Sequence, residues 1–513
     1  MGRDVFFITT PIYYANDVPH IGHAYTEVAS DFIARYRRLR GDDVRYLTGT
    51  DEHGLKVARA AEENDVTPRE WTDSLEPRWR EVWQRLDISY DDYIRTTEPR
   101  HYESVAKILQ AVHDNGRDDI YQGTYEGLYC VACEAYYTED DLIEGNCPIH
   151  GRPVEHMREE NYFFRLSAYQ DRLLEHYAAN PTAIEPDVRR NEVVSLIQGG
   201  LQDFSISRTT FDWGVPIPWD REHVTYVWFD ALTNYITAAG YANDPERFAR
   251  QWPANIHLIG KDIVRFHAVY WPAMLMAAGL EPPTQVWAHG YLLVGGEKMS
   301  KTKLTGIHPF ELIDHFGVDS YRYYFMREIS FGQDGNFSWE SMTERHNADL
   351  ANGLGNLASR VLAMLGSYFD GAVPEPVTAG AESDLPGVID DALRRYDEHM
   401  IQVQLQPALV SVWDIVARAN HYLVEKEPWK LAKDPVNRDE LASVLYAAAE
   451  TLRVLAVAVA PIMPQAAEAL WAQLGVADSL DAQRLPAAGV WGGLAVGTST
   501  TKGASLFPRL EAD

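Results

Sequence analysis

Hydrophobic and polar positions follow two different patterns along the chain. In the first part, strand-like apolar runs at residues 5–9, 44–47, 256–260 and 286–288 are separated by amphipathic, helix-like stretches. Such alternation predicts an α/β fold with a doubly wound, Rossmann-like parallel sheet. From about residue 346, long Ala- and Leu-rich stretches of helical period, 392–426 and 438–460, replace the strands. They predict an all-helical domain in the C-terminal part.

Changes in this pattern suggest where the domains begin and end. The predicted order is the first half of the sheet domain (1–115), an insertion (116–225), the second half of the sheet domain (226–290), a lysine-loop region (291–345), the helical domain (346–485) and a C-terminal tail (486–513). The segment 486–502 is rich in Gly, Ala, Ser and Thr, which is typical of a loop or linker.

Two short motifs supply the chemistry of an ATP-cleaving site. His20, Gly22 and His23 follow the first strand and begin the next amphipathic stretch, so both imidazoles lie at a helix N-terminus, where phosphate is favoured. Lys298 and Lys301 follow Gly295-Gly296, and such a loop can close over a triphosphate and neutralise the departing pyrophosphate. The alternatives are capping histidines and a solvated basic loop.

The cysteines indicate a metal site. Cys130 and Cys133 form one chelating pair, and Cys147 and His150 form a second. Four protein ligands close a tetrahedral site, so we expect one structural zinc ion per chain. The alternative is three buried free thiols. An odd number of cysteines cannot all form internal disulfides.

Composition and charge narrow the class of protein. With 513 residues and 46% hydrophobic content, the chain can form two or three cores. We see no apolar run near the ~20 residues that cross a bilayer and no signal peptide, so we expect a cytoplasmic protein that does not bind membranes. The formal charge of −29 argues against nonspecific binding to a polyanion, although basic residues can still cluster locally.

The order and separation of the two motifs resemble those of class I aminoacyl-tRNA synthetases, and their surroundings are similar to the methionyl-tRNA synthetase family. The resemblance implies that the chain activates L-methionine with ATP and Mg²⁺, giving methionyl-adenylate and pyrophosphate, and then transfers methionine to the 3′ end of tRNA(Met). It also implies roles in ATP binding and catalysis for His20, Gly22, His23, Gly260, Asp262, Lys298 and Lys301.

The same resemblance implies the two recognition sites and the place of the metal. The methionine pocket would be lined by Ile12, Tyr14, Trp228, Ala231, Leu232, Tyr235 and His289, with Asp51 on the substrate ammonium group. The CAU anticodon would be read by Asn356, Arg360, Pro428 and Trp429. Without the resemblance, the first set is more typical of a sheet core and the second of a helix surface and a core tryptophan. The zinc knuckle would lie in the insertion.

The sequence differs from some members of the family in one pocket residue and at its C-terminal end. Leu232 stands where some members of the family have proline, which affects the shape of the pocket but not its class. Nothing follows the family-like ending at residues 506–510 except Glu511, Ala512 and Asp513, so the module that dimerises some members is not expected and we predict a monomer.

Other classes of enzyme fit the sequence less well. Synthetases for leucine, isoleucine and valine need a large editing insertion, because one methylene discriminates by only ~1–3 kcal/mol, and the insertion here is too small. A cysteine enzyme would hold its substrate on an open zinc site, whereas these ligands are compact. A small nucleotidyltransferase would not need the helical domain. A catalytically silent tRNA-binding paralogue remains an alternative, although the intact histidines and lysines argue against it.

Overall fold

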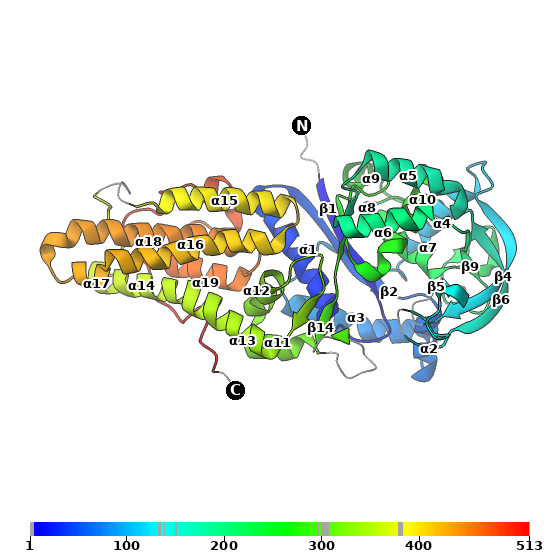
Figure 1. Cartoon of the computed structure of the whole chain (residues 1–513), viewed down its shortest axis with the longest axis horizontal. Coiled ribbons are helices and arrows are strands. Elements are labelled where there is room, and N and C mark those ends of the chain that lie inside the picture. The colour runs from blue at the N-terminus through cyan, green and yellow to red at the C-terminus, as the bar shows by residue number, and fades with distance from the viewer. Residues whose placement is uncertain are drawn as a thin grey trace. The chain divides into compact units, whose positions relative to one another are not determined.

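The computed structural model describes residues 5–131, 135–137, 139–148, 151–294, 297–298, 307–377 and 383–511. The chain divides into two compact units that interleave along the sequence (Figure 1). The first consists of Met1–Pro19, Val44–Trp83 and Tyr90–Gly290, and the second of His20–Asp43, Gln84–Ser89 and Tyr291–Asp513.

The first unit is built on a six-stranded sheet. Its strands, in spatial order, are β3 (Asp92–Arg95), β2 (Asp43–Asp51), β1 (Val5–Tyr14), β12 (Ile256–Gly260), β13 (Val286–His289) and β7 (Ile184–Glu185). The pairs β2 with β3, β1 with β12, β12 with β13 and β13 with β7 are parallel. The order reverses between β1 and β12, so the predicted doubly wound parallel sheet is confirmed. Ligands bind at such a reversal, beyond the carboxyl ends of the strands.

Two strands of this sheet extend further than the apolar pattern predicted. β1 continues to Tyr14, and β2 continues through Gly49 to Asp51. The pairing of β2 with β3 runs from Leu47 to Thr50, and a Cβ atom on Gly49 would lie 2.0 Å from the carbonyl oxygen of Ile94. Only glycine therefore fits this strand position, although glycine by itself is typical of a turn.

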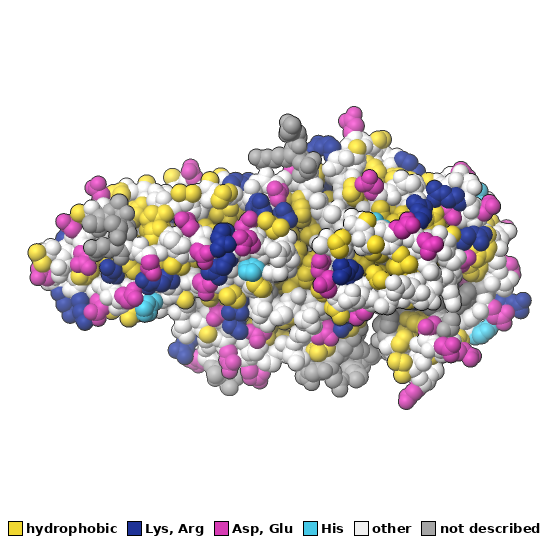
Figure 2. Space-filling view, turned by 45° about the horizontal axis from the view of Figure 1, so that its top comes forward, with side chains coloured by type: hydrophobic (Ala, Val, Ile, Leu, Met, Phe, Trp, Pro, Cys, Tyr) yellow, Lys and Arg dark blue, Asp and Glu magenta, His cyan; other side chains and the backbone are white. Residues whose placement is uncertain are grey.

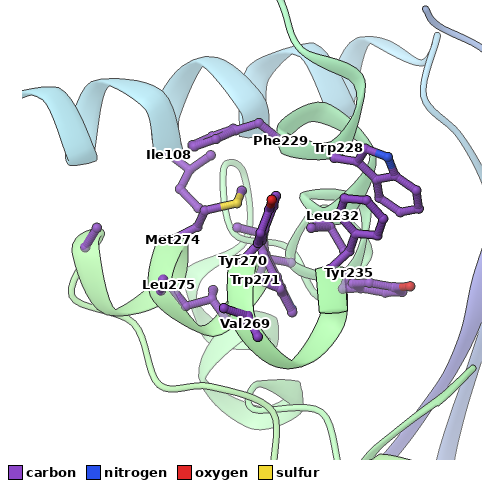
Figure 3. Packing of buried hydrophobic residues seen from close by; sticks show 14 of the residues in the cluster. Ile108, Trp228, Phe229, Leu232, Tyr235, Val269, Tyr270, Trp271, Met274 and Leu275 are labelled. Carbon is purple, nitrogen blue, oxygen red and sulfur yellow. The ribbon is translucent and has the colours of Figure 1, made fainter. Parts of the chain in front are cut away.

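Helices and a large apolar core complete the sheet domain. The helices are α2 (Leu55–Glu63), α3 (Pro68–Arg85, whose last two residues belong to the second unit), α4 (Pro99–His113), α5 (Gln170–Ala179), α6 (Asp187–Gln198), α7 (Val227–Leu232), α8 (Asn234–Ala239), α9 (Pro245–Gln251) and α10 (Trp271–Ala277). Short helical turns lie at Glu139–Asp141, Leu166–Tyr169, Lys261–Ile263 and Phe266–Tyr270. Figure 3 shows α4, α7, α8 and α10 contributing Ile108, Phe229, Tyr235 and Met274 to one buried cluster.

The predicted insertion forms two small antiparallel sheets and also contributes strand β7 to the main sheet. One small sheet has the order β5 (Ala135–Tyr137), β4 (Ile120–Cys130), β6 (Glu155–Phe164) and β8 (Phe204–Ser205), and the other has the order β10 (Pro216–Ile217), β11 (Asp220–Thr225) and β9 (Ser207–Arg208). A buried ion pair, with 2.8 Å between Arg208 Nε and Glu159 Oε2, joins strands β9 and β6.

The second unit combines helices with a three-stranded sheet. The sheet has the order β15 (Glu297–Lys298), β14 (Leu292–Val294) and β16 (Gly335–Phe337). The helices are α1 (Ile21–Arg40), α11 (Pro309–Phe316), α12 (Val318–Glu328), α13 (Trp339–Arg345), α14 (Asn356–Phe369), α15 (Leu385–Ile401), α16 (Leu405–Lys426), α17 (Pro428–Leu431), α18 (Arg438–Val459) and α19 (Pro464–Leu474). A π-helix, His346–Gly355, precedes α14. Short 3₁₀ turns lie at Pro435–Asn437, Leu480–Ala482 and Ala487–Gly489. The long helices α15, α16 and α18 lie side by side (Figure 1).

The C-terminal part is helical as predicted, with two differences. The stretch 392–426 belongs to two helices, because Val403 between them has a φ of 58°, outside the helical region. The segment 486–502 is a loop but not a linker between domains. Its Gly492, Gly493 and Leu494 N–H groups donate to the buried carboxylate of Glu450 on α18 at 2.9, 3.0 and 2.8 Å.

One stretch within the described residues, Pro435–Val459, is long and apolar enough to span a membrane by length and composition. Its most apolar window is 94% buried inside the protein. A core helix of a soluble domain has the same properties.

Candidate active site

The two histidines form the N-terminal cap of α1. The N–H of Gly22 donates to Nδ1 of His20 at 3.0 Å, and the N–H of His20 donates to Nδ1 of His23 at 3.2 Å. The two rings stack with 3.8 Å between their centroids. This arrangement satisfies two helix N–H groups through side chains, so the capping role and the predicted phosphate-binding role fall on the same residues.

The capping bonds fix which ring nitrogen carries the proton. Since Nδ1 of His20 and of His23 each accepts a backbone N–H, a neutral ring carries its proton on Nε2. An imidazole can donate from that atom to an anionic oxygen. The positive end of the 20-residue helix α1 lies at the same place, which favours an anion further.

Helix α1 is held by a buried ion pair within the second unit. Asp31 Oδ2 lies 2.6 Å from Nη2 of Arg322 on α12, and both side chains are fully buried. Arg322 also donates to the carbonyl groups of Leu86 at 2.9 Å and Ile462 at 2.8 Å. Burial alone would raise the pKa of Asp31, but Arg35 and Arg322 more than offset it and lower the pKa to about 2.

Both ends of the lysine loop can be placed. Lys298 lies on β15, and its backbone pairs with Leu293 of β14. At the other end, the carbonyl of Ile307 accepts a hydrogen bond of 3.3 Å from the N–H of Ile21, directly beside the two histidines. Lys301 and the rest of residues 299–306 lie outside the described residues. The structure thus brings the end of the loop, though not a described lysine side chain, to the histidines.

The residues predicted to bind methionine come from the carboxyl ends of the central strands and from the helices beyond them. Ile12 and Tyr14 lie on β1, Asp51 ends β2, His289 ends β13, and Trp228, Ala231 and Leu232 lie on α7 with Tyr235 on α8. Tyr14 meets Trp228 edge to face at 6.4 Å, and Trp228 stacks on Phe266 at 3.8 Å. Figure 3 shows Trp228, Leu232 and Tyr235 within the buried cluster.

Tyr235 is oriented by a buried pair of histidines. Its hydroxyl donates to Nε2 of His267 at 2.7 Å, because Nδ1 of that ring donates to the carbonyl of Ile263 at 3.0 Å. Burial lowers the pKa of His267 to about 4, and burial also lowers the pKa of His257 well below its usual value. The pKa of Tyr235 is raised, chiefly by burial, and the nearby Asp51 carboxylate adds to the increase.

Gly260, Asp262 and His289 lie together at the ends of β12 and β13. A Cβ atom on Gly260 would lie 2.7 Å from Oδ1 of Asp262 and 3.8 Å from the ring of His289. Burial lowers the pKa of His289, while the Asp262 carboxylate acts in the opposite direction. This part of the predicted ATP site is therefore assembled in the first unit, next to a predicted methionine ligand.

Sequence reasoning missed a buried carboxylate behind the methionine residues. Asp230 on α7 accepts from Nδ1 of His53 and from Nε2 of His101, both at 2.6 Å. Burial alone would raise its pKa, but the two histidines more than offset this and lower it to about 2. The available signal was an acidic residue inside the apolar run from Val227 to Leu232, since a buried charge needs partners.

The predicted zinc ligands are described only in part. Cys130 and Cys147 are buried and are not in disulfides, and the Cys147 N–H donates to the carbonyl of Arg152 at 2.9 Å. Cys133 and His150 lie outside the described residues, and within the described part of the chain no three potential ligands cluster. Two buried thiols in the insertion, Cys130 at the end of β4 and Cys147 in a loop, fit the chemistry of a structural zinc site.

The four anticodon candidates lie on two neighbouring helices of the second unit. Asn356 is exposed at the start of α14, and Arg360 lies one turn further along. The guanidinium of Arg360 lies over the ring of Trp429, 5.4 Å from its centre. Pro428 is buried, and Trp429 is partly exposed. Three of these side chains can therefore face a ligand, and Trp429 is not a fully buried core residue.

Comparisons with known proteins agree over the full length of the chain. Residues 6–155 and 140–362 match the model of class I tRNA synthetases (M), and residues 373–513 match that of the anticodon binding domain of methionyl tRNA ligase. The methionine–tRNA ligase of Streptomyces coelicolor is 52% identical over 99% of this chain and 97% of its own length, and that of Bacillus subtilis is 47% identical over 100% of this chain and 79% of its own.

A solved structure shows the same fold. Mycobacterium tuberculosis methionyl-tRNA synthetase in complex with methionyl-adenylate has a TM-score of 0.94 and 44% identity, covering 99% of this chain and 100% of that protein. Sequence motifs, sheet topology and relatives of this length and similarity lead to one assignment. The chain belongs to the methionine–tRNA ligase family of class I aminoacyl-tRNA synthetases.

Proposed function

We propose that this chain joins L-methionine to tRNA(Met) in two steps, forming methionyl-adenylate from ATP and then transferring the methionyl group to the 3′-terminal adenosine. The observation that carries the proposal is the N-terminus of α1, where two imidazoles stack and the N–H of Ile21 donates to the carbonyl of Ile307 at the end of the lysine loop. Such a site needs no protein nucleophile, because positioning and charge stabilisation supply the catalysis.

In the first step, His20 and His23 donate to phosphate oxygens of ATP, and Gly22 lets the nucleotide approach the backbone. Gly260 and Asp262 also bind ATP. Lys298 and Lys301 stabilise the charge that develops on pyrophosphate. Mg²⁺ bound with ATP supplies further neutralisation of the phosphates.

Methionine is held by residues of the first unit. Asp51 pairs with its ammonium group, and an apolar, aromatic wall suits a polarizable thioether. That wall consists of Ile12, Tyr14, Trp228, Ala231, Leu232, Tyr235 and His289. The T-shaped contact of Tyr14 with Trp228 and the anchored hydroxyl of Tyr235 support this role.

The helical domain, residues 346–485, recognises the CAU anticodon. Asn356 and Arg360 hydrogen-bond base edges, while Trp429, positioned by Pro428, stacks on an unpaired base.

The remaining domains are proposed as sheet-domain halves at 1–115 and 226–290, an insertion at 116–225, a stem-contacting lysine-loop region at 291–345 and a tail at 486–513. We also propose a cytoplasmic monomer. One structural zinc ion, held by Cys130, Cys133, Cys147 and His150, would be detected by metal analysis of the purified protein.

Methionine-dependent exchange of pyrophosphate with ATP tests the proposed reaction. Lys301→Ala should raise the activation free energy of the exchange reaction by about 2–4 kcal/mol and leave the affinity for methionine nearly unchanged. The reason is that the lysine ammonium group interacts with charge that develops on pyrophosphate only as the phosphate bond of ATP breaks. Wild-type protein that binds tRNA without catalysing exchange would instead identify a silent paralogue. Normal exchange by the Lys301 variant would remove that lysine from the mechanism.

A further inference from the structure

The histidine His257 in the central sheet has no role in the proposed chemistry so far. It lies on β12, and its backbone pairs with that of Thr9 on the neighbouring strand β1. Both side chains are fully buried. A buried polar side chain needs hydrogen-bond partners, whereas an apolar residue would fill the same space without that need. The partners of His257 therefore indicate what the residue does.

Two hydrogen bonds fix the orientation of the His257 ring. The indole N–H of Trp271 donates to its Nε2 at 3.2 Å. Because an indole nitrogen can only donate, Nε2 carries no proton, and the proton of the neutral ring is on Nδ1. Nδ1 then donates to the hydroxyl oxygen of Thr9 at 2.7 Å, so a turn of the ring would break both hydrogen bonds. Burial keeps the ring neutral, since it lowers the pKa of His257 well below its usual value, and the neighbouring His267 adds to the decrease.

The fixed imidazole ring supports Tyr235, one of the residues proposed to hold methionine. The two ring centres are 4.1 Å apart, and the ring planes are inclined by 30°. The Tyr235 hydroxyl is bound to His267, and the ring centre of Trp252 lies 6.0 Å from that of His257. Tyr235 is 1% exposed and His257 is 0% exposed. Because the interior is close-packed, Tyr235 can move toward His257 only if that ring moves as well.

We propose that His257, acting through Tyr235, limits the length of the side chain that the methionine pocket accepts. A substrate longer than methionine has to displace a pocket wall, and the Tyr235 wall is backed by a ring that two hydrogen bonds hold in place. The substrate class is then an unbranched thioether that ends in a methyl group, while an S-ethyl group is excluded. His257 is a positioning residue, because it acts through Tyr235. This inference rests on the proposed function and deepens it.

Methionine and ethionine, which carries an S-ethyl group in place of the S-methyl group, are the probes. In the wild type we expect kcat/KM in amino-acid-dependent pyrophosphate exchange to be roughly 10–200-fold lower for ethionine, the usual effect of one methylene in an apolar pocket. His257→Asn and His257→Ala remove the ring, and the asparagine amide can still donate to Thr9. In each variant the ratio of kcat/KM for ethionine to that for methionine should rise about tenfold or more, while KM for ATP stays within about twofold of wild type. Either variant suffices for the test.

Two further variants separate the ring from other effects. His257→Phe keeps a flat ring against Tyr235 but loses both hydrogen bonds, so its melting temperature should fall while the ratio stays within about threefold of wild type. Phe164→Ala removes a fully buried ring on β6 that packs against Tyr169 and Phe204, and it should lower the melting temperature without changing the ratio. The rise in melting temperature that each amino acid produces measures its binding without catalysis and should show the same preference.

An unchanged ratio in both His257→Asn and His257→Ala would overturn the proposal. So would an equal increase in His257→Phe, which would assign the effect to the hydrogen bonds, or in Phe164→Ala, which would assign it to a general loosening of the core. A wild-type protein that does not discriminate against ethionine would also contradict it. Absence of exchange with methionine in the wild type would instead contradict the proposed function itself.

Discussion

Asp230 is a buried residue that holds in place the helix proposed to carry several methionine contacts. It lies on α7 between Trp228 and Ala231, and its carboxylate ties that helix to His53 after β2 and to His101 on α4. The methionine contacts proposed for α7 therefore depend on a carboxylate that is bound to two histidines. We regard Asp230 as a positioning residue.

The variant Asp230→Asn should raise KM for methionine about tenfold, equivalent to about 1.4 kcal/mol, while KM for ATP changes little. Loss of the charge weakens both histidine contacts and lets α7 shift, and breaking a buried pair also lowers the free energy of unfolding. Steady-state exchange kinetics with each substrate varied in turn measure the effect. Asp114→Asn, at an exposed aspartate beside His113, is the control. Equal increases in both KM values would indicate a general structural defect.

Residue types that carry chemistry could be recognised in the sequence, but their hydrogen-bond partners could not. The spacing of His20 and His23 identifies them as candidate phosphate ligands. That their Nδ1 atoms accept backbone N–H groups can be seen only from the backbone conformation at the start of the helix. The partners of Asp230 are 129 and 177 residues away in the chain. A local pattern contains no information on contacts at such separations.

Helices α14 and α17 are the elements on which the proposed tRNA recognition depends. Arg360 covers part of Trp429 at 5.4 Å, and the indole is only partly buried. A partly exposed tryptophan beside an arginine is suited to stack on an unpaired base, because both groups offer planar faces.

Replacing Trp429 with alanine should therefore reduce kcat/KM for tRNA by roughly one to two orders of magnitude, from the loss of ~1–3 kcal/mol of base stacking. Methionine activation without tRNA should stay near normal. The same preparation is tested for exchange, aminoacylation and thermal unfolding. A parallel loss of all three would mean that the tryptophan acts in packing, where a cavity costs about 3–5 kcal/mol.

The contact between α12 and α19 contains a carboxylate whose burial is only partly compensated. Oδ2 of Asp319 accepts the N–H of Ala466 at 2.5 Å, whereas Oδ1 has no hydrogen-bond partner among the described residues. Burial raises the pKa of Asp319 to about 6. Because the folded pKa exceeds the unfolded value, this group stabilises the fold below about pH 4, and the contribution is lost as pH rises through about 6.

Asp319→Asn should remove this pH dependence. The free energy of unfolding of the variant relative to wild type should increase by up to about 3 kcal/mol between about pH 4 and pH 7, since the amide keeps an acceptor for Ala466 and cannot ionise. Denaturant unfolding at several pH values measures the difference. Asp390→Asn, at an exposed position on α15, should give a flat profile. A relative stability that falls with pH would contradict the interpretation.

Element types could largely be predicted from periodicity, while two boundaries could not. The strand β2 passes through Gly49 because β3 approaches within the radius of a side chain, and the helix break at Val403 depends on a backbone conformation that valine rarely adopts. In both cases a tertiary contact or a local conformation overrides the intrinsic preference of the residue.

At the scale of the whole molecule, the sequence order and the spatial division differ. Residues 20–43 and 84–89 belong with the C-terminal half in the second unit, where Asp31 and Ser89 form a hydrogen bond of 2.7 Å and Asp31 pairs with Arg322. Linear domain boundaries cannot represent such interleaving. The proposed phosphate-binding histidines consequently belong to a different compact unit from the residues proposed to hold methionine.

The charge of the chain also acts on the molecule as a whole. There are 75 acidic and 46 basic residues, giving a formal charge of −29, and Figure 2 shows acidic and basic side chains interspersed on the visible face. Like charges repel across the surface and destabilise the folded state. Exposed ion pairs oppose this weakly, since each is worth about 0–1 kcal/mol. Net repulsion should therefore dominate the response to salt.

Raising NaCl from about 0.01 M to about 1 M shortens the Debye length from about 30 Å to about 3 Å. At pH 8 we expect the melting temperature of this 513-residue chain to rise by about 1 °C for each kcal/mol of repulsion that is screened, since the unfolding entropy is about 2.1 cal/mol/K per residue. Affinity for tRNA should fall over the same range, because the release of counterions into more concentrated salt gains less free energy. Thermal unfolding and tRNA titrations on one preparation measure both. Near the sequence pI of about 4.9, where the net charge vanishes, the salt effect on melting should disappear. A melting temperature that falls with salt at pH 8 would mean that ion pairs outweigh the repulsion.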